Sequence, residues 1–378
     1  MNVLLVEPDY YTKYPPLGLM KLASYYRSRG DKIKLIRGIN NELNFNTDKI
    51  LITSLFTYAW RPVHKAIEFY HRLFPDASME VGGIYASMMP HRISSSYSFL
   101  KVRVGLYEAA EHYLPAYDIL KNTEKWQKWD ASILFTSRGC IRKCPFCIVP
   151  KLEGKIRSNI KDIQNYIYPG HKRIILWDNN FLASPTWKDA LTELKEIGLQ
   201  VDFNQGLDAR LIDEERAQLL SELKMPIIRM AYDFIEEKNN IIKAVDLLSG
   251  YGIRRRNILI YTLYNFYSKN SSYNDTPEAF HAKIKDILEL GCVAYPMRFE
   301  PNNSLKKNQY ISPLWTAEQL EAVADARRVI GYGGAFPPYE GLIKKVNKAN
   351  GFDDAFHLYP LKSNIKPSTS DHLARADI

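Results

Sequence analysis

The chain has 378 residues, which is enough for two folded domains. Hydrophobic residues make up 46% of it, as in globular proteins, and no apolar run is long enough to span a membrane. The formal net charge of +9 is compatible with an acidic partner such as nucleic acid, but a globular protein with many surface lysines explains it as well. The four cysteines argue against a disulfide scaffold, and the first residues lack the regions of a signal peptide. We therefore expect a protein of the reducing cytoplasm, with no membrane partner.

Residues 1–112 alternate short apolar strands with amphipathic helices. The predicted strands cover 3–6, 32–36, 50–55, 79–83 and 100–104, and the predicted helices cover 19–28 and 62–73. This alternation is typical of a doubly wound parallel sheet of the Rossmann type. Ligands of such sheets bind beyond the carboxyl ends of the strands. In this sequence those ends are followed by Pro15-Pro16, Thr53-Ser54, Gly82-Gly83 and Gly105.

Residues 113–130 are polar and charged, and we predict a linker that Trp126 and Trp129 anchor on one domain. The strand–helix alternation resumes over 131–301. Strands are predicted at 131–136, 173–177, 200–204, 227–232, 257–263 and 292–299, with helices at 159–167, 184–197, 213–223, 235–249 and 276–290. Residues 302–365 are expected to form an extension of helices and loops with a helix over 316–330, and 366–378 a flexible tail.

Three of the four cysteines lie in the loop after the first of these strands, as Cys140, Cys144 and Cys147 at C-x3-C-x2-C spacing. Thiolates favour zinc, Cu(I) or iron–sulfur clusters. Structural zinc uses a closed set of four ligands, and no Cys or His pair follows to complete one. Because a [4Fe–4S] cluster normally takes four cysteines, three indicate a cluster with one iron open to an exogenous ligand. A zinc site or a redox-active cysteine loop is the alternative.

The cysteine spacing, with the aromatic Phe146 before the last cysteine, resembles the radical S-adenosylmethionine (SAM) family. The six strand–helix units match the partial (β/α)6 TIM-type barrel of that family, in which chemistry gathers at the carboxyl ends of the strands. The resemblance implies that SAM chelates the open iron, near Phe146. Reductive cleavage of SAM would then give methionine and a 5′-deoxyadenosyl radical. An electron donor such as flavodoxin or ferredoxin is the implied partner.

Further segments after the barrel strands resemble SAM-binding elements of the family. Asp178 and Asn179 lie where relatives hold the SAM amino group with a carboxylate or a carbonyl, although both residue types are also common in turns. Arg210 is expected either to pair with the SAM carboxylate or to form a structural ion pair with Asp208 or Asp233. Asp233 lies where relatives place an acid that binds the ribose hydroxyls, although the residues flanking it differ from the family pattern.

The N-terminal half resembles the cobalamin-binding domain that precedes the cluster in one branch of radical SAM enzymes. The residues implied to contact cobalamin are Pro16, Leu17, Ser54, Gly82, Gly83, Ser87 and Gly105. Two features depart from that pattern: Tyr107 stands where a small residue is common, and no Asp-x-His-x-x-Gly motif supplies an axial histidine. The alternative is a vestigial Rossmann-like domain that packs on the barrel and helps to form the substrate site.

Tyr261, Tyr264 and Arg298, on the last two predicted barrel strands, are candidates for contacting substrate, although an ordinary aromatic core is the alternative. The substrate class stays open between a small molecule, a peptide and a nucleic acid. The N-terminal half has no cysteine, which disfavours a tRNA methylthiotransferase. The resemblance implies cobalamin-dependent methyl transfer to an unactivated carbon. A cobalamin-free radical SAM reaction (oxidation, cyclisation or epimerisation) and a non-catalytic iron–sulfur module are the alternatives.

Overall fold

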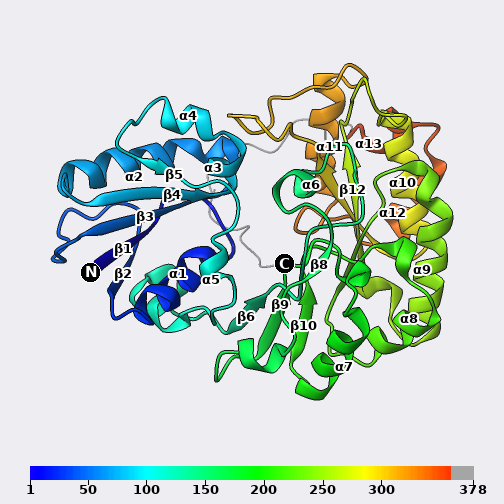
Figure 1. Ribbon diagram of the computed structural model, residues 1–378. Helices are drawn as coiled ribbons and strands as arrows, with labels where there is room; N and C mark the ends of the chain where they lie inside the picture. Colours follow the sequence, from blue (N-terminus) through cyan, green and yellow to red (C-terminus); the bar gives the residue numbers. More distant parts are fainter. Residues whose placement is uncertain (359–378) are drawn as a thin grey trace.

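The computed structural model describes residues 1–358. The predicted tail at 366–378 and the end of the predicted extension over 302–365 lie outside the described residues. Figure 1 shows two α/β parts side by side, the N-terminal part in blue to cyan and the second part in green to orange. No helix of residues 1–358 is long and apolar enough to cross a membrane.

The N-terminal part contains a five-stranded parallel sheet in the order β2-β1-β3-β4-β5. The strands are β1 (Asn2–Glu7), β2 (Lys32–Arg37), β3 (Lys49–Ser54), β4 (Ser78–Gly83) and β5 (Lys101–Val102). This is the order of flavodoxin-like doubly wound sheets, so the predicted Rossmann-like class is confirmed. The predicted fifth strand, 100–104, is shortened to two residues, and Arg103 directly after it forms an ion pair with Glu80.

Helices cover both faces of this sheet. On one face lies α1 (Leu17–Arg27), with α5 (Glu108–Glu111) beside it. On the other face lie α2 (Trp60–Leu73), α3 (Ile84–Met88) and α4 (Pro90–Ser94), preceded by the 3-10 turn η1 (Thr57–Ala59). The central strand β1 is buried almost throughout, as expected for a parallel strand covered by helices on both sides.

The predicted linker, 113–130, is packed rather than solvated. It contains the 3-10 turns η2 (Tyr117–Asn122) and η3 (Glu124–Trp126), and its apolar side chains join the core under α1. Trp126 is buried there, and its Nε1 donates a hydrogen bond to Glu7, so the predicted tryptophan anchor lies on the N-terminal part. Tyr117 reaches the other part, where its hydroxyl accepts from the backbone nitrogen of Ile133 at 2.6 Å.

The second part has six parallel strands in two sheets, β10-β9-β6 and β11-β12-β13. They are β6 (Ala131–Leu134), β9 (Arg173–Leu176), β10 (Gln200–Phe203), β11 (Ile228–Ala231), β12 (Ile258–Tyr264) and β13 (Val293–Arg298). Isolated parallel bridges, Gln200 to Lys224 and Leu207 to Met230, lie where the two sheets approach each other. The strands thus follow one another in chain order, as the predicted partial barrel requires.

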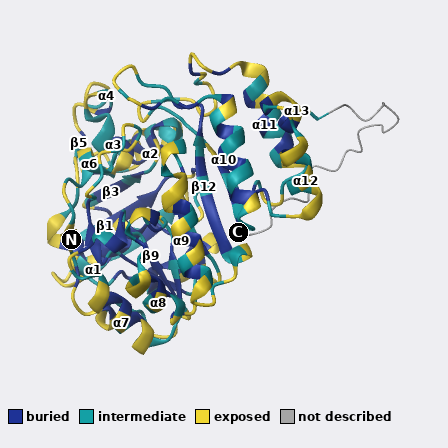
Figure 2. Cartoon of the chain, turned by 90° about the vertical axis from the view of Figure 1, so that its right-hand side faces the viewer, coloured by how far each residue is buried: buried dark blue, intermediate teal, exposed yellow. Residues whose placement is uncertain are grey.

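Helices α7 (Trp187–Ile197), α8 (Glu214–Ser221), α9 (Lys238–Gly250) and α10 (Pro277–Glu289) pack on these strands. Short 3-10 turns η5 (Phe181–Ala183), η6 (Ala209–Leu211), η7 (Ile235–Glu237) and η8 (Arg255–Asn257) connect them, and α11 (Ala317–Val329), α12 (Glu340–Lys348) and α13 (Phe352–Phe356) follow. Figure 2 shows the strands buried and the outer helix surfaces exposed.

The predicted helix over 159–167 is wrong, because only the 3-10 turn η4 (Ile163–Tyr166) forms there. Ser158 is paired in a short strand, and the Asn159 side chain bonds the Phe135 carbonyl. Neither residue is therefore free to begin a helix.

The N-terminal part covers the inner face of β6 and β9. Leu17 packs with Ala131, Ile133 and Ile175 in one apolar cluster, and Tyr14 lies edge-on to Trp177 at 5.3 Å. Apolar contact therefore holds the N-terminal part against β6 and β9.

Candidate functional site

The cysteine loop, residues 139–156, leaves and re-enters the fold through one short antiparallel pair. That pair is β7 (Ser137–Arg138) with β8 (Arg157–Ser158), and the loop contains the helical turn α6 (Val149–Leu152). The loop closes tightly at its base. Gly139 has a φ of +80°, and a Cβ there would lie 2.3 Å from the Lys155 carbonyl oxygen. A glycine is therefore required directly before Cys140.

The three thiols lie close enough to influence one another. Cys140 and Cys144 are half-buried and Cys147 is exposed. Burial raises the pKa of Cys144 to about 11, and Cys147 adds to the increase. Burial also raises the pKa of Cys147, with a contribution from Cys140. Within residues 1–358, no three Cys, His, Asp or Glu side chains gather as a single metal ion requires. Binding of a cluster would have to displace the thiol protons, because thiolates are the ligands.

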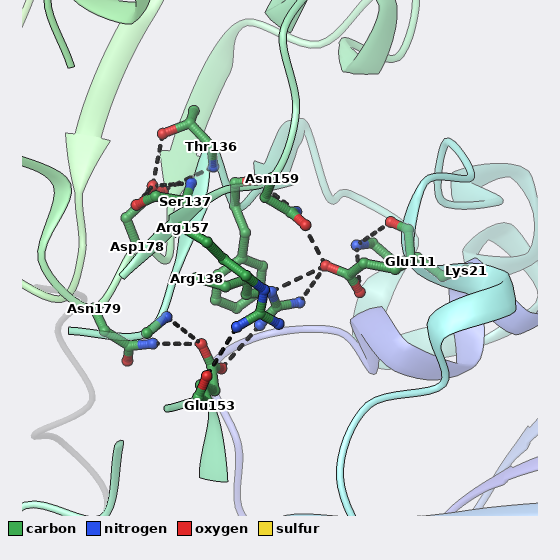
Figure 3. A network of polar contacts seen from close by, with 12 residues as sticks. Lys21, Glu111, Thr136, Ser137, Arg138, Glu153, Arg157, Asn159, Asp178 and Asn179 are labelled. Atoms are coloured by element: carbon green, nitrogen blue, oxygen red, sulfur yellow. Dashed lines mark hydrogen bonds and ion pairs between the residues drawn. The ribbon is translucent and has the colours of Figure 1, made fainter. Parts of the chain in front are cut away.

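Asp178 is fully enclosed by the chain that leads into the cysteine loop. Its carboxylate accepts hydrogen bonds from the backbone nitrogens and hydroxyls of Thr136 and Ser137, at 2.5 to 3.1 Å (Figure 3). This carboxylate, predicted to hold the SAM amino group, fixes the end of β6. Asn179 likewise donates to Glu153 at 2.8 Å.

Asn180, which the sequence analysis did not single out, lies against the first cysteine. Its Nδ2 is 3.6 Å from the Cys140 sulfur and 3.1 Å from Asp208 Oδ2. Its Oδ1 is buried and has no hydrogen-bond partner among the described residues. Such an orphaned acceptor is the signal of a missing donor, and no sequence pattern distinguishes it from the asparagine beside it.

Arg210 is held in a network of ion pairs next to the thiols. It donates to Asp208 at 2.7 Å and to Glu237 at 2.6 Å, and Arg142 donates to the same Asp208 at 2.9 Å. Burial alone would raise the pKa of Asp208, but Arg210 and Arg142 hold it below its ordinary value. The structural ion pair with Asp208 is thus present, whereas the one considered with Asp233 is replaced by Glu237.

Asp233 lies near Cys144, and Phe146 belongs to the cysteine loop itself. Asp233 Oδ1 accepts from the Leu263 nitrogen at 3.1 Å, and burial raises the pKa of this carboxyl. The fully buried Lys283 donates to the Asp233 carbonyl oxygen at 2.8 Å and so fixes the backbone beneath the carboxyl. Phe146 packs against Phe234, with ring centroids 5.7 Å apart.

The three candidate substrate contacts lie in different surroundings. Tyr261 is edge-on to Tyr295 at 5.4 Å, and burial raises the pKa of its hydroxyl. Tyr264 is buried between α10 and the extension, with Phe280 at 5.0 Å, so at this position the aromatic-core alternative holds. Arg298 donates to the Tyr310 carbonyl oxygen at 2.9 Å, which ties β13 to the extension.

A cavity of about 220 Å³ lies between the two parts of the chain, at the carboxyl ends of β3 and β4. Of the residues expected to contact cobalamin, Leu17, Gly82, Gly83 and Gly105 line it, and Phe135, Arg138 and Trp177 face it from the second part. Gly83 has a φ of +100°, and a Cβ there would lie 2.1 Å from the Ser54 carbonyl oxygen. The Trp177 Nε1 is buried and has no hydrogen-bond partner among the described residues.

The other residues expected to contact cobalamin do not line the cavity and make contacts within the N-terminal part. Ser54 donates to the Gly82 carbonyl oxygen at 2.8 Å, and Ser87 donates to that of Gly83 at 2.8 Å. Pro16 is the N-cap residue of α1. Both hydroxyls, predicted to contact cobalamin, shape the glycine turns at this edge.

A larger hollow of about 920 Å³ lies at the β2 side of the N-terminal part. Its walls come from Asp9, residues 35–42, the first half of α2 and residues 122–125, so the cysteine loop does not contribute to it.

No protein-family model matches the sequence, and no curated protein is significantly similar to it. Among solved structures, the chain is similar to the radical S-adenosylmethionine methyltransferase TsrM from Kitasatospora setae with cobalamin and a [4Fe–4S] cluster bound. That match has a TM-score of 0.60 and 16% identity over 80% of this chain and 77% of TsrM. TsrM with tryptophan substrate and the SAM analogue aza-SAM matches with a TM-score of 0.57 and 14% identity, over 78% and 72% of the two chains. At this identity the likeness shows a shared fold.

Proposed function

We propose that this chain is a radical SAM enzyme that holds a [4Fe–4S] cluster on Cys140, Cys144 and Cys147 and transfers a methyl group to an unactivated carbon with the help of cobalamin. The observation that carries the proposal is the clamped loop of three neighbouring thiols after β6, in a fold shared with TsrM. When bound on the three cysteines, the cluster with SAM would supply radical chemistry, and cobalamin in the cavity between the two parts would carry the methyl group.

The residues beside the loop fit SAM. An ammonium group has donors and no acceptor, so the orphaned, buried Oδ1 of Asn180 suits the SAM amino group. Asp233, a carboxylate that the Leu263 nitrogen fixes through Oδ1, suits a ribose hydroxyl. Arg210 is committed to Asp208 and Glu237, and we therefore assign it to orienting these acids rather than to gripping the SAM carboxylate.

The cavity between the two parts fits cobalamin incompletely. Gly82 and Gly83 allow a flat ligand to approach the backbone, and Trp177 offers an unpaired N–H. However, pockets for drug-sized ligands measure roughly 300–1,000 Å³, and about 220 Å³ is available here. Tyr107 fills part of the space, with the Arg103 guanidinium 4.2 Å from its ring centroid. This favours, as the second candidate, a radical SAM reaction that uses no cobalamin.

Anaerobic reconstitution of the full chain with iron, sulfide and hydroxocobalamin tests the proposal. After desalting, we expect about four irons per chain and one cobalamin, and cleavage of SAM when dithionite is added. A loaded cluster that cleaves SAM without retained cobalamin would leave the second candidate. A loaded cluster that never cleaves SAM would favour a non-catalytic module, and stoichiometric zinc in protein purified anaerobically would exclude the radical mechanism.

A further inference from the structure

A buried network of charged side chains joins the N-terminal part to the base of the cysteine loop (Figure 3). Its centre is Glu111, at the end of α5, which is 5% exposed. The Oε1 of Glu111 accepts hydrogen bonds from Arg138 at 2.6 and 2.9 Å and from Asn159 at 3.1 Å. Its Oε2 lies 3.2 Å from the Lys21 ammonium, which comes from α1. One carboxylate of the N-terminal part thus holds the residues on both sides of the cysteine loop.

From Arg138 the network continues into the loop itself. Arg138 also donates to Glu153 Oε1 at 3.0 Å. The other oxygen of Glu153 accepts from the Gly139 backbone nitrogen at 3.0 Å, one residue before Cys140. The network therefore fixes Gly139, at the entry to the loop, and Glu153, in its last part, through ion pairs and one backbone hydrogen bond that start in the other part of the molecule.

The charges in this network balance. Lys21 and Arg138 are the cations, and Glu111 and Glu153 the anions. Burial alone would raise the pKa of Glu111, but Arg138 and Lys21 hold it below its ordinary value. Removal of one carboxylate charge leaves a buried cation without its partner, which is much less favourable than the complete network.

The same side chains form a wall of the cavity between the two parts. Lys21, Glu111 and Arg138 line it, together with Gly83 and Trp177. An occupant of the cavity would therefore lie against the carboxylate that holds the loop.

We propose that Glu111 is a positioning residue for the cysteine loop, acting through Arg138 and Glu153, and that it couples the cavity between the two parts to the group held by the cysteines. The positioning role stands on the network alone, whereas the coupling rests on the proposed function. Coupling of this kind is a reciprocal free energy between two sites.

Amide hydrogen exchange of the metal-free full chain tests the positioning role without any cofactor. In Glu111→Gln, we expect backbone amides of 139–158 to exchange at least about tenfold faster than in the wild type, because a local opening becomes easier. Glu80→Gln is the matched control: Glu80 is also buried at this cavity, but it pairs with Arg103 and Lys101 and not with the loop. Equal exchange in Glu111→Gln and the wild type would overturn the proposal.

If Glu111→Gln does not fold, Lys21→Met removes the other charge that the N-terminal part contributes. We expect it to speed exchange in the same segment about threefold, and unchanged exchange would contradict the network's role. Glu111→Asp retains the carboxylate and is expected to restore most of the protection.

The coupling is tested on the reconstituted protein by electron paramagnetic resonance of the reduced cluster. Addition of hydroxocobalamin should change the wild-type signal, and Glu111→Gln should abolish that change while both groups stay bound. A signal change of equal size in the variant, or none in the wild type, would overturn the coupling. A wild-type chain that assembles no cluster would instead defeat the proposed function, and the exchange experiment would still decide the positioning role.

Discussion

The carboxyl ends of the N-terminal sheet and those of the strands in the second part meet at one cavity. These two edges differ in what they offer to a bound group. At the second part, the three thiols of the cysteine loop are free of disulfide bonds, and the Asn180 Oδ1 beside them has no hydrogen-bond partner among the described residues. At the N-terminal part, the two serines expected to bind cobalamin are used within the domain to shape glycine turns. The edge of the second part therefore offers ligand atoms to a bound group, whereas the edge of the N-terminal part mainly determines the shape of the cavity.

The largest difference between the edges should appear when the thiols are removed. We expect Cys144→Ala to lower the iron content after anaerobic reconstitution from about four to below about one per chain. Cys292→Ala is the control, because Cys292 is buried in the core of the second part and should leave the iron content unchanged. Equal loss in both variants, measured by iron and sulfide assays, would show that the loop is not the ligand set.

The sequence was sufficient to predict elements whose signal is local. Every strand of the three parallel sheets overlaps an apolar run that predicted it, and the order of elements fits the predicted α/β class. The thiols were found because cysteine has its own chemistry and a recognisable spacing. By contrast, Asp178 and Asn180 are nearly adjacent and similar in type, and only their three-dimensional partners assign one to structure and the other to an open acceptor.

The remaining features that the sequence did not predict depend on contacts between residues far apart in the chain. The Glu111–Arg138 pair joins residues 27 positions apart, and the Trp126–Glu7 bond joins residues 119 apart. No periodicity reports such contacts. The expected linker was judged by its charge, although Tyr117 and Trp126 carry the apolar surface that packs it against α1.

The role of shape at the N-terminal edge is tested by Gly83→Ala. The added Cβ would meet the Ser54 carbonyl oxygen at 2.1 Å with a φ of +100°, so we expect a loss of roughly 2–4 kcal/mol of unfolding free energy. Gly82→Ala is the matched control, since its nearest neighbour would be 3.9 Å away and its φ lies outside the left-handed region. Urea unfolding of both variants measures the difference, and similar losses would mean that the turn does not need Gly83.

Removal of the open acceptor at the cysteine edge should affect binding more than stability. Asn180→Ala takes away one hydrogen bond to a charged group, which is worth about 1.5–3 kcal/mol. We therefore expect SAM affinity of the reconstituted protein to fall by roughly 10–100-fold while the iron content is retained. Asn165→Ala, at an exposed position, serves as the control in the same titration. Unchanged affinity in Asn180→Ala would assign the orphaned oxygen to another donor.

The smallest expected effect compares one histidine in each part. Burial lowers the pKa of His64, which lies between the hydroxyls of Tyr85 and Tyr97, and burial likewise lowers the pKa of His171 beside Ser132. Since the folded pKa lies below the unfolded value of about 6.5, the folded state prefers the neutral ring. The stability that results is present above about pH 6.5 and is lost as the pH falls toward the folded value.

Thermal unfolding between pH 7.5 and 5.5 checks this sign. His64→Gln should flatten the fall of Tm on acidification by about 1–3 °C, and His171→Gln should do the same for the second part. His112→Gln, an exposed position, should leave the slope as it is. If only one histidine variant changes the slope, the two parts unfold at different temperatures. The network at Glu111 would then not hold them together through thermal unfolding, whereas equal changes in both variants would indicate one cooperative unit.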